Sequence, residues 1–500
     1  MSHDYDVIII GSGPAGFSCA MQSSKFDKKA LVVEAHEKYL GGTWINTGTV
    51  PSKALREAAK TISDFNAQFG GEQPRKPYDQ FRMQDLLKYK DDILEKENRK
   101  IKNDLIKNKV DVARGTGTLV DEHTVEVHTH IGSVQTYSAD YILVCTGSRP
   151  VSPNRFEIDH NRVLDYTSLL KLTHIPRRLT IVGGGVNALE YATTFSALGS
   201  RVSVLTSRGE VLSFLDAEIK ELFLESLRKR NIHLQIGVRV EDIGYNSLQN
   251  YTEVSYRAKD DPDSRLEVIE TEHVLFMGGR RPNTSELNLE EVGIKTDDKD
   301  FIRTSEVFQT DVPSIYAAGD VIGFPQLASA SFTQGRLAAC NMFGIPMQEV
   351  PDRTPYAIYT IPEISHIGIT EEEAERQELD VTVGRAYFKN VVKTDMTGHD
   401  EGMLKLVFQK DSLKLLGVHI FGDEAANLLH LGQSVMAYDG DIRYFTQHVM
   451  NYPTLGEAYR IAAFNGFNRA YKAGVKYKSL LEDAQPPTDA PKKQDVREEE

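Results

Sequence analysis

The pattern of apolar and polar residues predicts an α/β fold that contains two strand-turn-helix units. Apolar runs at residues 7–10 and 179–182 stand directly before glycine-rich turns, and further apolar runs follow at residues 30–34 and 201–205. Short continuous apolar runs of this kind are typical of parallel strands that helices cover on both faces. The chain is therefore expected to contain two separate β-α-β units.

Other segments predict elements outside these units. Residues 83–109 are highly charged, with Leu87, Leu94 and Ile101 at heptad spacing, which predicts a long helix with a narrow apolar seam and a solvated outer face. We interpret this helix as part of the scaffold. The alternating segments 124–130 and 252–257 predict antiparallel strands.

The C-terminal part of the chain predicts a separate α+β domain. From residue 351 onward it mixes strand and helix patterns, as at residues 404–408 and 425–438. Residues 483–500 are rich in Pro, Lys, Asp and Glu without periodicity, and this composition predicts a disordered tail.

The first glycine-rich turn has the spacing of a dinucleotide site. Gly11, Gly13 and Gly16 stand between a strand and a helix, and Glu34 ends the next strand. The glycines permit a tight turn, close approach of a pyrophosphate and close helix packing, while the helix N-terminus attracts the phosphates. Glu34 can accept hydrogen bonds from an adenosine ribose. Asp320 follows a third apolar strand and can bind the polyol hydroxyls of a large dinucleotide.

The second turn repeats the fingerprint with one difference. Gly183, Gly185 and Ala188 take the three positions, but the second strand of this unit runs into Ser207 and Arg208 with no acid. The missing acid removes the main repulsion against a 2′-phosphate, and Arg208 can pair with such a group. The alternative is that Arg208 is only a solvated loop charge.

The composition of the chain limits its possible binding partners and its expected cellular location. The 500 residues include 58 Lys and Arg against 72 Asp and Glu, and the net charge of −14 argues against nucleic acid or an anionic membrane as a partner. Cys19, Cys145 and Cys340 are the only cysteines, so the chain lacks a disulfide scaffold and any Cys-x-x-Cys motif, and no metal site is predicted. No apolar run approaches the roughly 18 residues of a membrane span, and no signal peptide is recognisable, so a cytoplasmic protein is expected.

Together these features resemble the FAD-dependent pyridine nucleotide-disulfide oxidoreductases, which include dihydrolipoamide dehydrogenase and glutathione reductase. The resemblance extends to about residue 472. Beyond the two fingerprints, it rests on Gly41-Gly42-Thr43, Pro51-Ser52-Lys53, Gly115-Thr116-Gly117, Cys145-Thr146-Gly147, residues 279–283 and Ala318-Gly319-Asp320. It implies FAD in the first site, NAD(H) or NADP(H) in the second, and a homodimer formed through the C-terminal domain.

The resemblance also implies which residues bind the two cofactors and where the domains begin and end. The FAD-binding positions are Gly11, Gly13, Gly16, Glu34, Gly42, Thr43, Lys53, Gly117, Gly147, Asp320 and Ala328. The NAD(P)-binding positions are Gly183, Gly185, Ala188, Glu190, Ser207, Arg208 and Gly279. The expected domains are FAD-binding at 1–155 and 279–350, NAD(P)-binding at 156–278, dimerisation at 351–475 and a tail at 476–500.

The departures from the family pattern indicate a different chemistry. Disulfide reductases of the family carry Cys-x-x-x-x-Cys after Gly-Gly-Thr, where this chain has Trp44 and Thr49. Their acid/base His-Pro-Thr is replaced here by Tyr452-Pro453-Thr454, while the orienting acid is retained as Glu457. The loss of the cysteine pair and the loss of the histidine are consistent with each other, because without thiol exchange there is no thiolate to protonate.

The hydride-transfer residues remain, and the resemblance is strongest to the soluble, FAD-dependent pyridine nucleotide transhydrogenases. Lys53 and Glu190 match the family's ion pair beside the flavin N5, where charge changes as hydride arrives. The transhydrogenase-like segments are residues 48–56, 359–365, 383–386 and 451–460. Trp44 departs even from this branch, in which a lone Cys is usual.

The expected function is hydride exchange between NADPH and NAD⁺ through FAD, with Lys53, Glu190, Tyr452 and Glu457 as candidate catalytic residues. An NAD(P)H dehydrogenase that reduces a quinone or oxygen would need the same two sites. A third alternative is a flavin-bound redox sensor that acts on a protein partner through its tail. Retention of Lys53, Glu190 and Glu457 favours an enzyme over a sensor.

Overall fold

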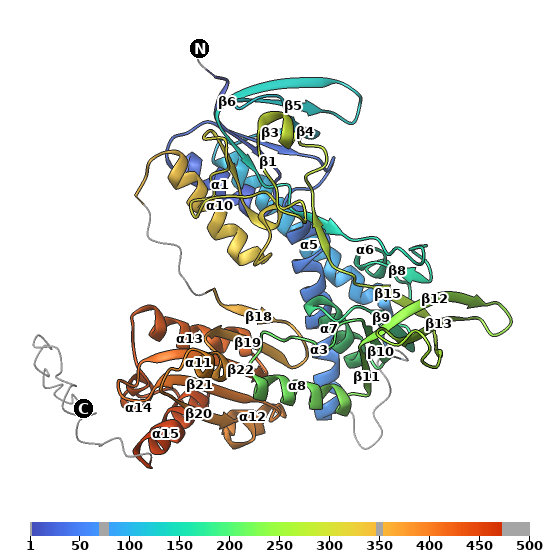
Figure 1. Cartoon of the computed structure of the whole chain (residues 1–500), viewed down its shortest axis with the longest axis vertical. Coiled ribbons are helices and arrows are strands. Elements are labelled where there is room, and N and C mark those ends of the chain that lie inside the picture. Colours follow the sequence, from blue (N-terminus) through green and yellow to red (C-terminus); the bar gives the residue numbers. More distant parts are fainter. Residues whose placement is uncertain (1–2, 70–79, 347–353, 473–500) are drawn as a thin grey trace, which may run out of the picture. The chain divides into compact units, whose positions relative to one another are not determined.

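The computed structural model describes residues 3–69, 80–346 and 354–472, which divide into two compact units (Figure 1). Unit 1 contains residues 1–213 and 225–352, and unit 2 contains residues 214–224 and 353–500. The predicted tail, residues 476–500, lies outside the described residues. The domain bounds expected from the sequence stay a prediction, because the two compact units cut the chain differently.

Unit 1 is built on two parallel sheets, one for each β-α-β unit predicted from the sequence. The first sheet has the order β3-β2-β1-β6, with β17 also beside β6, and the antiparallel strands β5 and β4 continue it. Its strands are β1 (Tyr5–Ile10), β2 (Ala30–Glu34), β3 (Asp111–Arg114), β4 (Thr116–Leu119), β5 (Thr124–His128), β6 (Val134–Val144) and β17 (Ile315–Ala317). Alternate residues of β1 enter different cores, Val7 and Ile9 on one face and Ile8 and Ile10 on the other.

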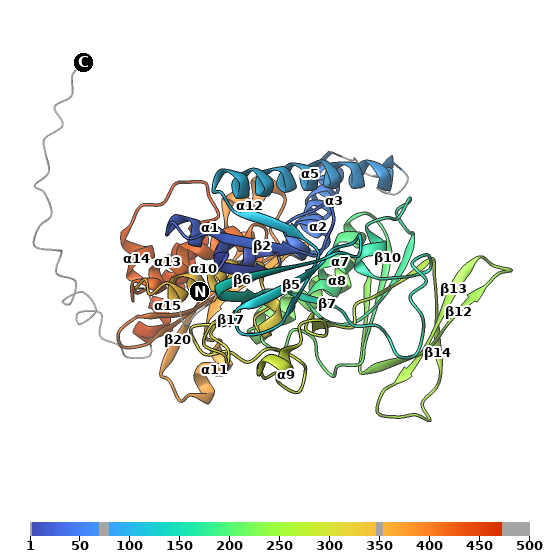
Figure 2. The ribbon, with the colours of Figure 1, turned by 90° about the horizontal axis from the view of Figure 1, so that it is seen from above.

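The second sheet is wholly parallel, with the order β11-β10-β9-β15-β8. Its strands are β8 (Val163–Leu164), β9 (Arg178–Val182), β10 (Arg201–Thr206), β11 (Ile232–Ile236) and β15 (His273–Phe276). A three-stranded antiparallel sheet projects at the edge of this part of unit 1 (Figure 2), formed by β12 (Val238–Asn246), β13 (Tyr251–Ala258) and β14 (Glu267–Thr271). A short ribbon pairs β7 (Ser148–Pro150) with β16 (Arg280–Pro282).

Helices cover the faces of these sheets. Helices α1 and α10 lie side by side although they are far apart in the sequence (Figure 1), and α3 packs along α5 (Figure 2). The helices of unit 1 are α1 (Pro14–Lys25), α2 (Gly42–Asn46), α3 (Thr49–Phe69), α5 (Met83–Lys107), α6 (Tyr166–Leu169), α7 (Val186–Ala197), α9 (Leu289–Val292) and α10 (Ala328–Met342), with the 3-10 turn η1 (Gly319–Ile322). Helix α5 is the predicted charged helix, and its buried stripe includes Met83, Leu86 and Ile101, while Leu87 is only half-buried.

Unit 2 is an antiparallel sheet with helices, which confirms the predicted C-terminal α+β domain. The strand order is β18-β19-β22-β21-β20, and the alternating apolar residues of β21 and β22 pack against α13 and α15. The elements are β18 (Tyr356–Ile358), β19 (Glu363–Gly368), α11 (Glu371–Arg376), β20 (Val381–Tyr387), η2 (Phe388–Asn390), α12 (Val392–Thr397), β21 (Met403–Gln409), β22 (Leu415–Gly422), α13 (Ala425–Ala437), α14 (Arg443–Gln447) and α15 (Glu457–Lys472).

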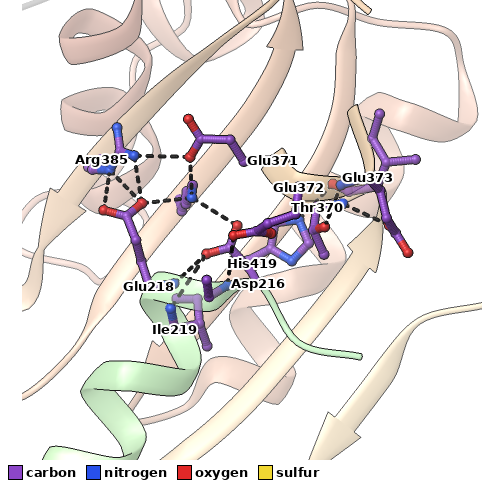
Figure 3. Close-up of polar contacts among 12 residues, drawn as sticks. Asp216, Glu218, Ile219, Thr370, Glu371, Glu372, Glu373, Arg385 and His419 are labelled. Atoms are coloured by element: carbon purple, nitrogen blue, oxygen red, sulfur yellow. Dashed lines mark hydrogen bonds and ion pairs between the residues drawn. The ribbon is translucent and has the colours of Figure 1, made fainter. Parts of the chain in front are cut away.

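A buried charge cluster holds a distant segment of the chain in unit 2 (Figure 3). Helix α8 (Ala217–Lys229) begins in unit 2 and ends in unit 1. The fully buried Lys405 ammonium of β21 lies 2.8 Å from Asp216 and 2.6 Å from both Glu218 and Glu371. These three contacts are ion pairs.

Arg385 of β20 completes this cluster. Its guanidinium donates to both carboxylate oxygens of Glu218, at 2.9 and 2.7 Å, and to Glu371 at 3.1 Å. Burial acts to raise the pKa of Glu218, but the hydrogen bonds from Arg385 and the positive charges of Lys405 and Arg385 outweigh it and hold that pKa below its usual value. The cluster therefore keeps the Glu218 carboxylate ionised.

Candidate cofactor and hydride-transfer site

The first glycine turn has the geometry that its spacing predicts. Gly11 has φ +114°, and a Cβ built on it would lie 2.4 Å from the Cys145 carbonyl oxygen. A Cβ on Gly16 would lie 2.0 Å from the Gly11 carbonyl oxygen, so the third glycine lets α1 approach the turn. A Cβ on Gly13 meets no atom of the described chain within 4 Å beyond its neighbours, which leaves open space at the α1 N-terminus. This open space is where a pyrophosphate would fit.

A cavity of about 360 Å³ lies over this turn, within the range of small-molecule sites. Most of the predicted FAD-binding positions line it. They are Gly11, Gly13, Glu34, Gly42, Thr43, Gly117, Gly147, Asp320 and Ala328. Gly16 and Lys53 do not line the cavity; Gly16 supports the turn from behind, and Lys53 lies one helical turn beyond the lining residue Thr49.

Glu34 lies at the end of β2 and is 8% exposed. Its Oε2 accepts from the Ser12 backbone N–H at 3.2 Å and from the Ser12 hydroxyl, and its Oε1 accepts from the His36 N–H at 2.8 Å. These bonds orient the carboxylate at the cavity wall. Ser12 is a residue that the sequence analysis missed; its place inside the Gly-x-Gly motif was the only available signal.

We expect Glu34→Arg to weaken FAD binding. The change removes a ribose acceptor and leaves the Ser12 donors without their partner, at a cost of about 1.5–3 kcal/mol for hydrogen bonds to a charged group. The measurement is the FAD dissociation constant, from flavin released on dilution. Glu37→Arg is the matched control, since Glu37 is exposed and does not line the cavity. Full flavin occupancy of Glu34→Arg under dilution would contradict the role of Glu34.

Asp320 borders the same cavity from η1. Its Oδ2 accepts from the Ser148 hydroxyl at 2.6 Å, and Arg280 Nε lies 3.7 Å away. Gly147, at φ +71°, leaves open space before this group, since a Cβ there meets no described atom within 4 Å beyond its neighbours. The carboxylate is thus held at the wall with lone pairs for hydroxyl groups.

The second glycine turn repeats these features at the start of α7. Gly183 has φ +142°, and a Cβ on it would lie 2.4 Å from the Met277 carbonyl oxygen. Gly185 opens to free space at the helix N-terminus, as Gly13 does, and Ala188 is buried in the helix packing. Gly279, at φ +117°, follows β15 across the sheet.

The loop after β10 carries the residues expected to discriminate between nucleotides. Ser207 and Arg208 are both exposed directly after the strand. The Arg208 backbone N–H donates to the Thr206 hydroxyl at 3.3 Å, and its carbonyl accepts from the Gly237 N–H at 2.9 Å. These two bonds hold the loop backbone and leave the guanidinium available to a phosphate.

An ion pair joins the two dinucleotide units. Lys53 Nζ of α3 lies 2.6 Å from Glu190 Oε2 of α7, and the two side chains are 23% and 9% exposed. Helix α3 starts at the cavity residue Thr49, and α7 starts at the second glycine turn. The structure therefore brings the two predicted hydride-transfer residues together between the two sites.

One cysteine, Cys145, lines the cavity, but it is only 6% exposed and its thiol donates to the Ile10 and Gly11 carbonyl oxygens at 3.2 and 3.3 Å. Trp44 and Thr49 line the cavity at the positions where the resemblance expects cysteines. All three cysteines are buried and free. Burial raises the pKa of Cys19 to about 12 and the pKa of Cys145 well above its usual value, so these thiols stay protonated near neutral pH.

Tyr452 and Glu457 belong to unit 2. The Tyr452 side chain is 64% exposed, and Glu457 is buried at the first turn of α15, where its Oε2 accepts from Arg460 at 2.9 Å. The catalytic role expected for these two residues stays a prediction.

Comparison with known proteins decides the family. Residues 5–335 match the family described as pyridine nucleotide-disulphide oxidoreductase, and residues 354–463 match its dimerisation domain. The chain belongs to the pyridine nucleotide-disulphide oxidoreductase family. The family prediction made from the sequence is thereby confirmed, as are its cofactors, FAD and a pyridine nucleotide.

Curated members of this family cover almost the whole chain. A soluble pyridine nucleotide transhydrogenase of Pseudomonas aeruginosa is 39% identical over 472 residues, which are 94% of this chain and 99% of that protein. A protein of the same name from a Marinomonas species is 38% identical over 470 residues, 93% of this chain and 99% of that protein.

Two solved structures confirm the predicted fold class. The HOCl-induced flavoprotein disulfide reductase RclA of Escherichia coli has a TM-score of 0.81 at 23% identity and covers 92% of this chain and 99% of its own. LpdA of Mycobacterium tuberculosis has a TM-score of 0.83 at 24% identity with the same coverage. At this identity the likeness shows the fold and carries no statement on activity.

The family's FAD fits the residues of the cavity. A Cβ built on Gly13 or Gly147 meets no described atom within 4 Å beyond its neighbours, and Gly42 packs so closely that a Cβ on it would lie 3.3 Å from the Gly13 Cα. The carboxylates of Glu34 and Asp320 lie at the wall for hydroxyl groups, and the α1 N-terminus is available to phosphates.

Proposed function

We propose that this chain is an FAD-dependent transhydrogenase, which transfers hydride between NADPH and NAD⁺ without a redox disulfide. The observation that carries the proposal is the Lys53–Glu190 ion pair of 2.6 Å between α3 and α7, beside a cavity that Trp44 and Thr49 line in place of thiols. The names of the transhydrogenase relatives support it.

FAD, when bound, supplies the chemistry of accepting a hydride from one nicotinamide and donating it to another. The residues of the chain would bind and orient the two dinucleotides and stabilise the charge at the reaction centre. The glycine turns and helix N-termini would bind the phosphates of the two dinucleotides, and Glu34 and Asp320 would accept hydrogen bonds from hydroxyl groups of FAD. Lys53 would place a positive charge beside the reaction centre, and its ion pair with Glu190 would hold it there.

The three cysteines support hydride transfer over thiol exchange. A disulfide reductase needs a thiolate that reaches its substrate, whereas Cys19, Cys145 and Cys340 are buried, and burial raises the pKa of each. Thiol-alkylating reagents should therefore leave the proposed activity nearly intact.

The test compares acceptors after reduction of the purified yellow protein by NADPH. We expect complete bleaching of the flavin without a thiolate charge-transfer band, and reoxidation by NAD⁺ with parallel initial-velocity lines, because the first nucleotide leaves before the second enters. Failure of NAD⁺ to reoxidise the flavin would overturn the proposal. Faster reoxidation by a quinone or oxygen would identify a dehydrogenase, and turnover by none of these acceptors would identify a redox sensor.

Arg208 is proposed to read the 2′-phosphate of NADPH. We expect Arg208→Ala to raise KM for NADPH more than for NADH, because a lost bond between two charged groups costs about 1.5–3 kcal/mol. The measurement is the ratio of kcat/KM for the two nucleotides. Arg201→Ala, at the opposite end of β10, is the control and should leave that ratio unchanged. Equal effects of Arg208→Ala on both nucleotides would remove this role.

We further propose that the enzyme acts as a cytoplasmic homodimer. The match of residues 354–463 to the family's dimerisation domain supports the dimer. No helix within residues 3–69, 80–346 and 354–472 is long and apolar enough to cross a membrane.

A further inference from the structure

The cavity contains an aromatic feature that the proposed function does not explain. Trp44 is the only tryptophan of the 500 residues, and its side chain lines the cavity from the short helix α2. It stands two residues after Gly42 and five before Thr49, the first residue of α3. An indole is a large apolar surface, and its partial exposure at a cavity wall requires a reason.

The order of the lining residues places Trp44 toward one end of a bound dinucleotide. Glu34 provides the ribose acceptor of the adenosine half, and the turn at Gly13 lies at the pyrophosphate. Gly42 packs on Gly13, and Thr43 and Trp44 continue the cavity wall from this point. The other half of the dinucleotide, which carries the ring system, would lie along this wall.

Two further aromatic rings hold the indole in place. Phe332 of α10 meets it edge-on, with ring centroids 4.8 Å apart and an interplanar angle of 85°. Phe17 of α1 lies 6.3 Å away at 46°. Trp44 therefore packs between the two helices whose N-termini border the cavity, and its orientation is fixed before a cofactor binds.

We propose that Trp44 is the aromatic contact of the bound flavin and closes that side of the ring, so that electrons leave only to a nicotinamide. The inference rests on the proposed function and adds to it a residue that determines acceptor specificity. The indole fills the space through which a disulfide, a quinone or oxygen would otherwise approach. The side reaction that the indole suppresses is the oxidation of reduced flavin by O₂. In this reaction two electrons pass from the flavin to O₂, which takes up two protons to form H₂O₂.

The test uses two readouts on three variants. An indole in contact with a flavin quenches its fluorescence by donating an electron to the excited ring, and phenylalanine does not. Trp44→Phe keeps a ring in the space but removes this donor, and Trp44→Ala removes both. Phe343→Leu is the matched control, since Phe343 packs against the same core without lining the cavity. The readouts are flavin emission of the oxidised holoprotein without nucleotide, and H₂O₂ formed with NADPH and oxygen alone.

We expect flavin emission to rise several-fold in Trp44→Phe and Trp44→Ala, and to stay at the wild-type level in Phe343→Leu. Peroxide formation should rise several-fold in Trp44→Ala but stay near the wild-type rate in Trp44→Phe. If Trp44→Ala does not retain FAD, Trp44→Leu provides the opened cavity.

Two outcomes would overturn the proposal. Emission of Trp44→Phe at the wild-type level would show that the indole does not contact the flavin. Unchanged peroxide formation in the opened variant would show that Trp44 does not close the cavity. The emission readout needs no nucleotide, so it decides the contact even if NAD⁺ fails to reoxidise the wild-type protein, and the two proposals can fail separately.

Discussion

Replacing Lys53 by Met is expected to slow reduction of the bound FAD by NADPH roughly 100-fold, the effect of removing one preorganised stabilising group from a reaction centre. The ammonium lies 2.6 Å from Glu190 in a largely buried pair, so the substitution removes a positive charge from a position that solvent hardly reaches. FAD should remain bound, because the glycine turns, Glu34 and Asp320 are untouched. The measurement is the decay of flavin absorbance in a stopped-flow instrument after mixing with NADPH.

Lys60→Met is the matched control for this prediction. Lys60 lies on the same helix α3 and forms an ion pair of 2.7 Å with Asp64, but it is about three helical turns from the cavity residue Thr49, whereas Lys53 is one turn from it. Its loss should leave the reduction rate unchanged. The double variant Lys53→Met/Glu190→Gln separates the effect of the charge on rate from its effect on stability, since it also removes the negative charge of Glu190. It should recover stability but not rate. A wild-type rate in Lys53→Met would assign Lys53 a structural role only.

Lys405→Met is expected to destabilise unit 2 by about 3–5 kcal/mol, the cost of breaking a buried ion pair by removing one partner. Lys405 is fully buried, and its loss leaves the carboxylates of Asp216, Glu218 and Glu371 with Arg385 as the remaining cation of the cluster. The urea midpoint and the hydrogen exchange of the β21 amides measure the effect. Exchange is needed because the two units can unfold separately.

Two further variants make this prediction specific. Lys410→Met removes a cation directly after β21 that pairs with the exposed Asp380 at 3.3 Å, and should cost less than about 1 kcal/mol. Asp216→Asn added to Lys405→Met removes one unpaired charge and keeps an oxygen for the α8 N-terminus, where Asp216 now accepts from the Glu218 N–H at 3.2 Å. This double variant should recover part of the loss. Equal stability of Lys405→Met and Lys410→Met would contradict the argument.

The sequence predicted those parts of the molecule that follow from local pattern. Strand β1, the turn at Gly11 and the acid Glu34 form one contiguous unit whose spacing carries its own physical reason, and the structure has them as predicted. The charged helix and the strands of unit 2 could be predicted equally well, because apolar periodicity is a local property of the sequence. The pairing of Lys53 with Glu190 came from the family resemblance and not from spacing.

What escaped prediction depends on contacts between distant segments. The partners of Trp44 come from α1 and α10, and no local pattern connects Phe17 with Phe332. Likewise Lys405 sits at an inward position of an apolar strand, where the sequence shows only a polar residue within Leu404-Lys405-Leu406. Its burial is possible only because carboxylates from α8 and α11 meet it there.

The α8 segment in unit 2 has a consequence for protein synthesis and for dissection of the gene. Glu218 and Arg385 are 167 residues apart in sequence, so residues 214–224 leave the ribosome long before the strands that receive them. Until then Asp216 and Glu218 remain solvated, and unit 2 can close only after β20 and β21 have been translated. A fragment that starts at residue 354 would begin where the dimerisation domain begins, but it would lack Asp216 and Glu218. Lys405 and Arg385 would then be buried with Glu371 as the one carboxylate left of the three in the cluster. The C-terminal domain of this enzyme is therefore a unit of structure but not of sequence, and an exchange of that domain between relatives must carry residues 214–224 with it.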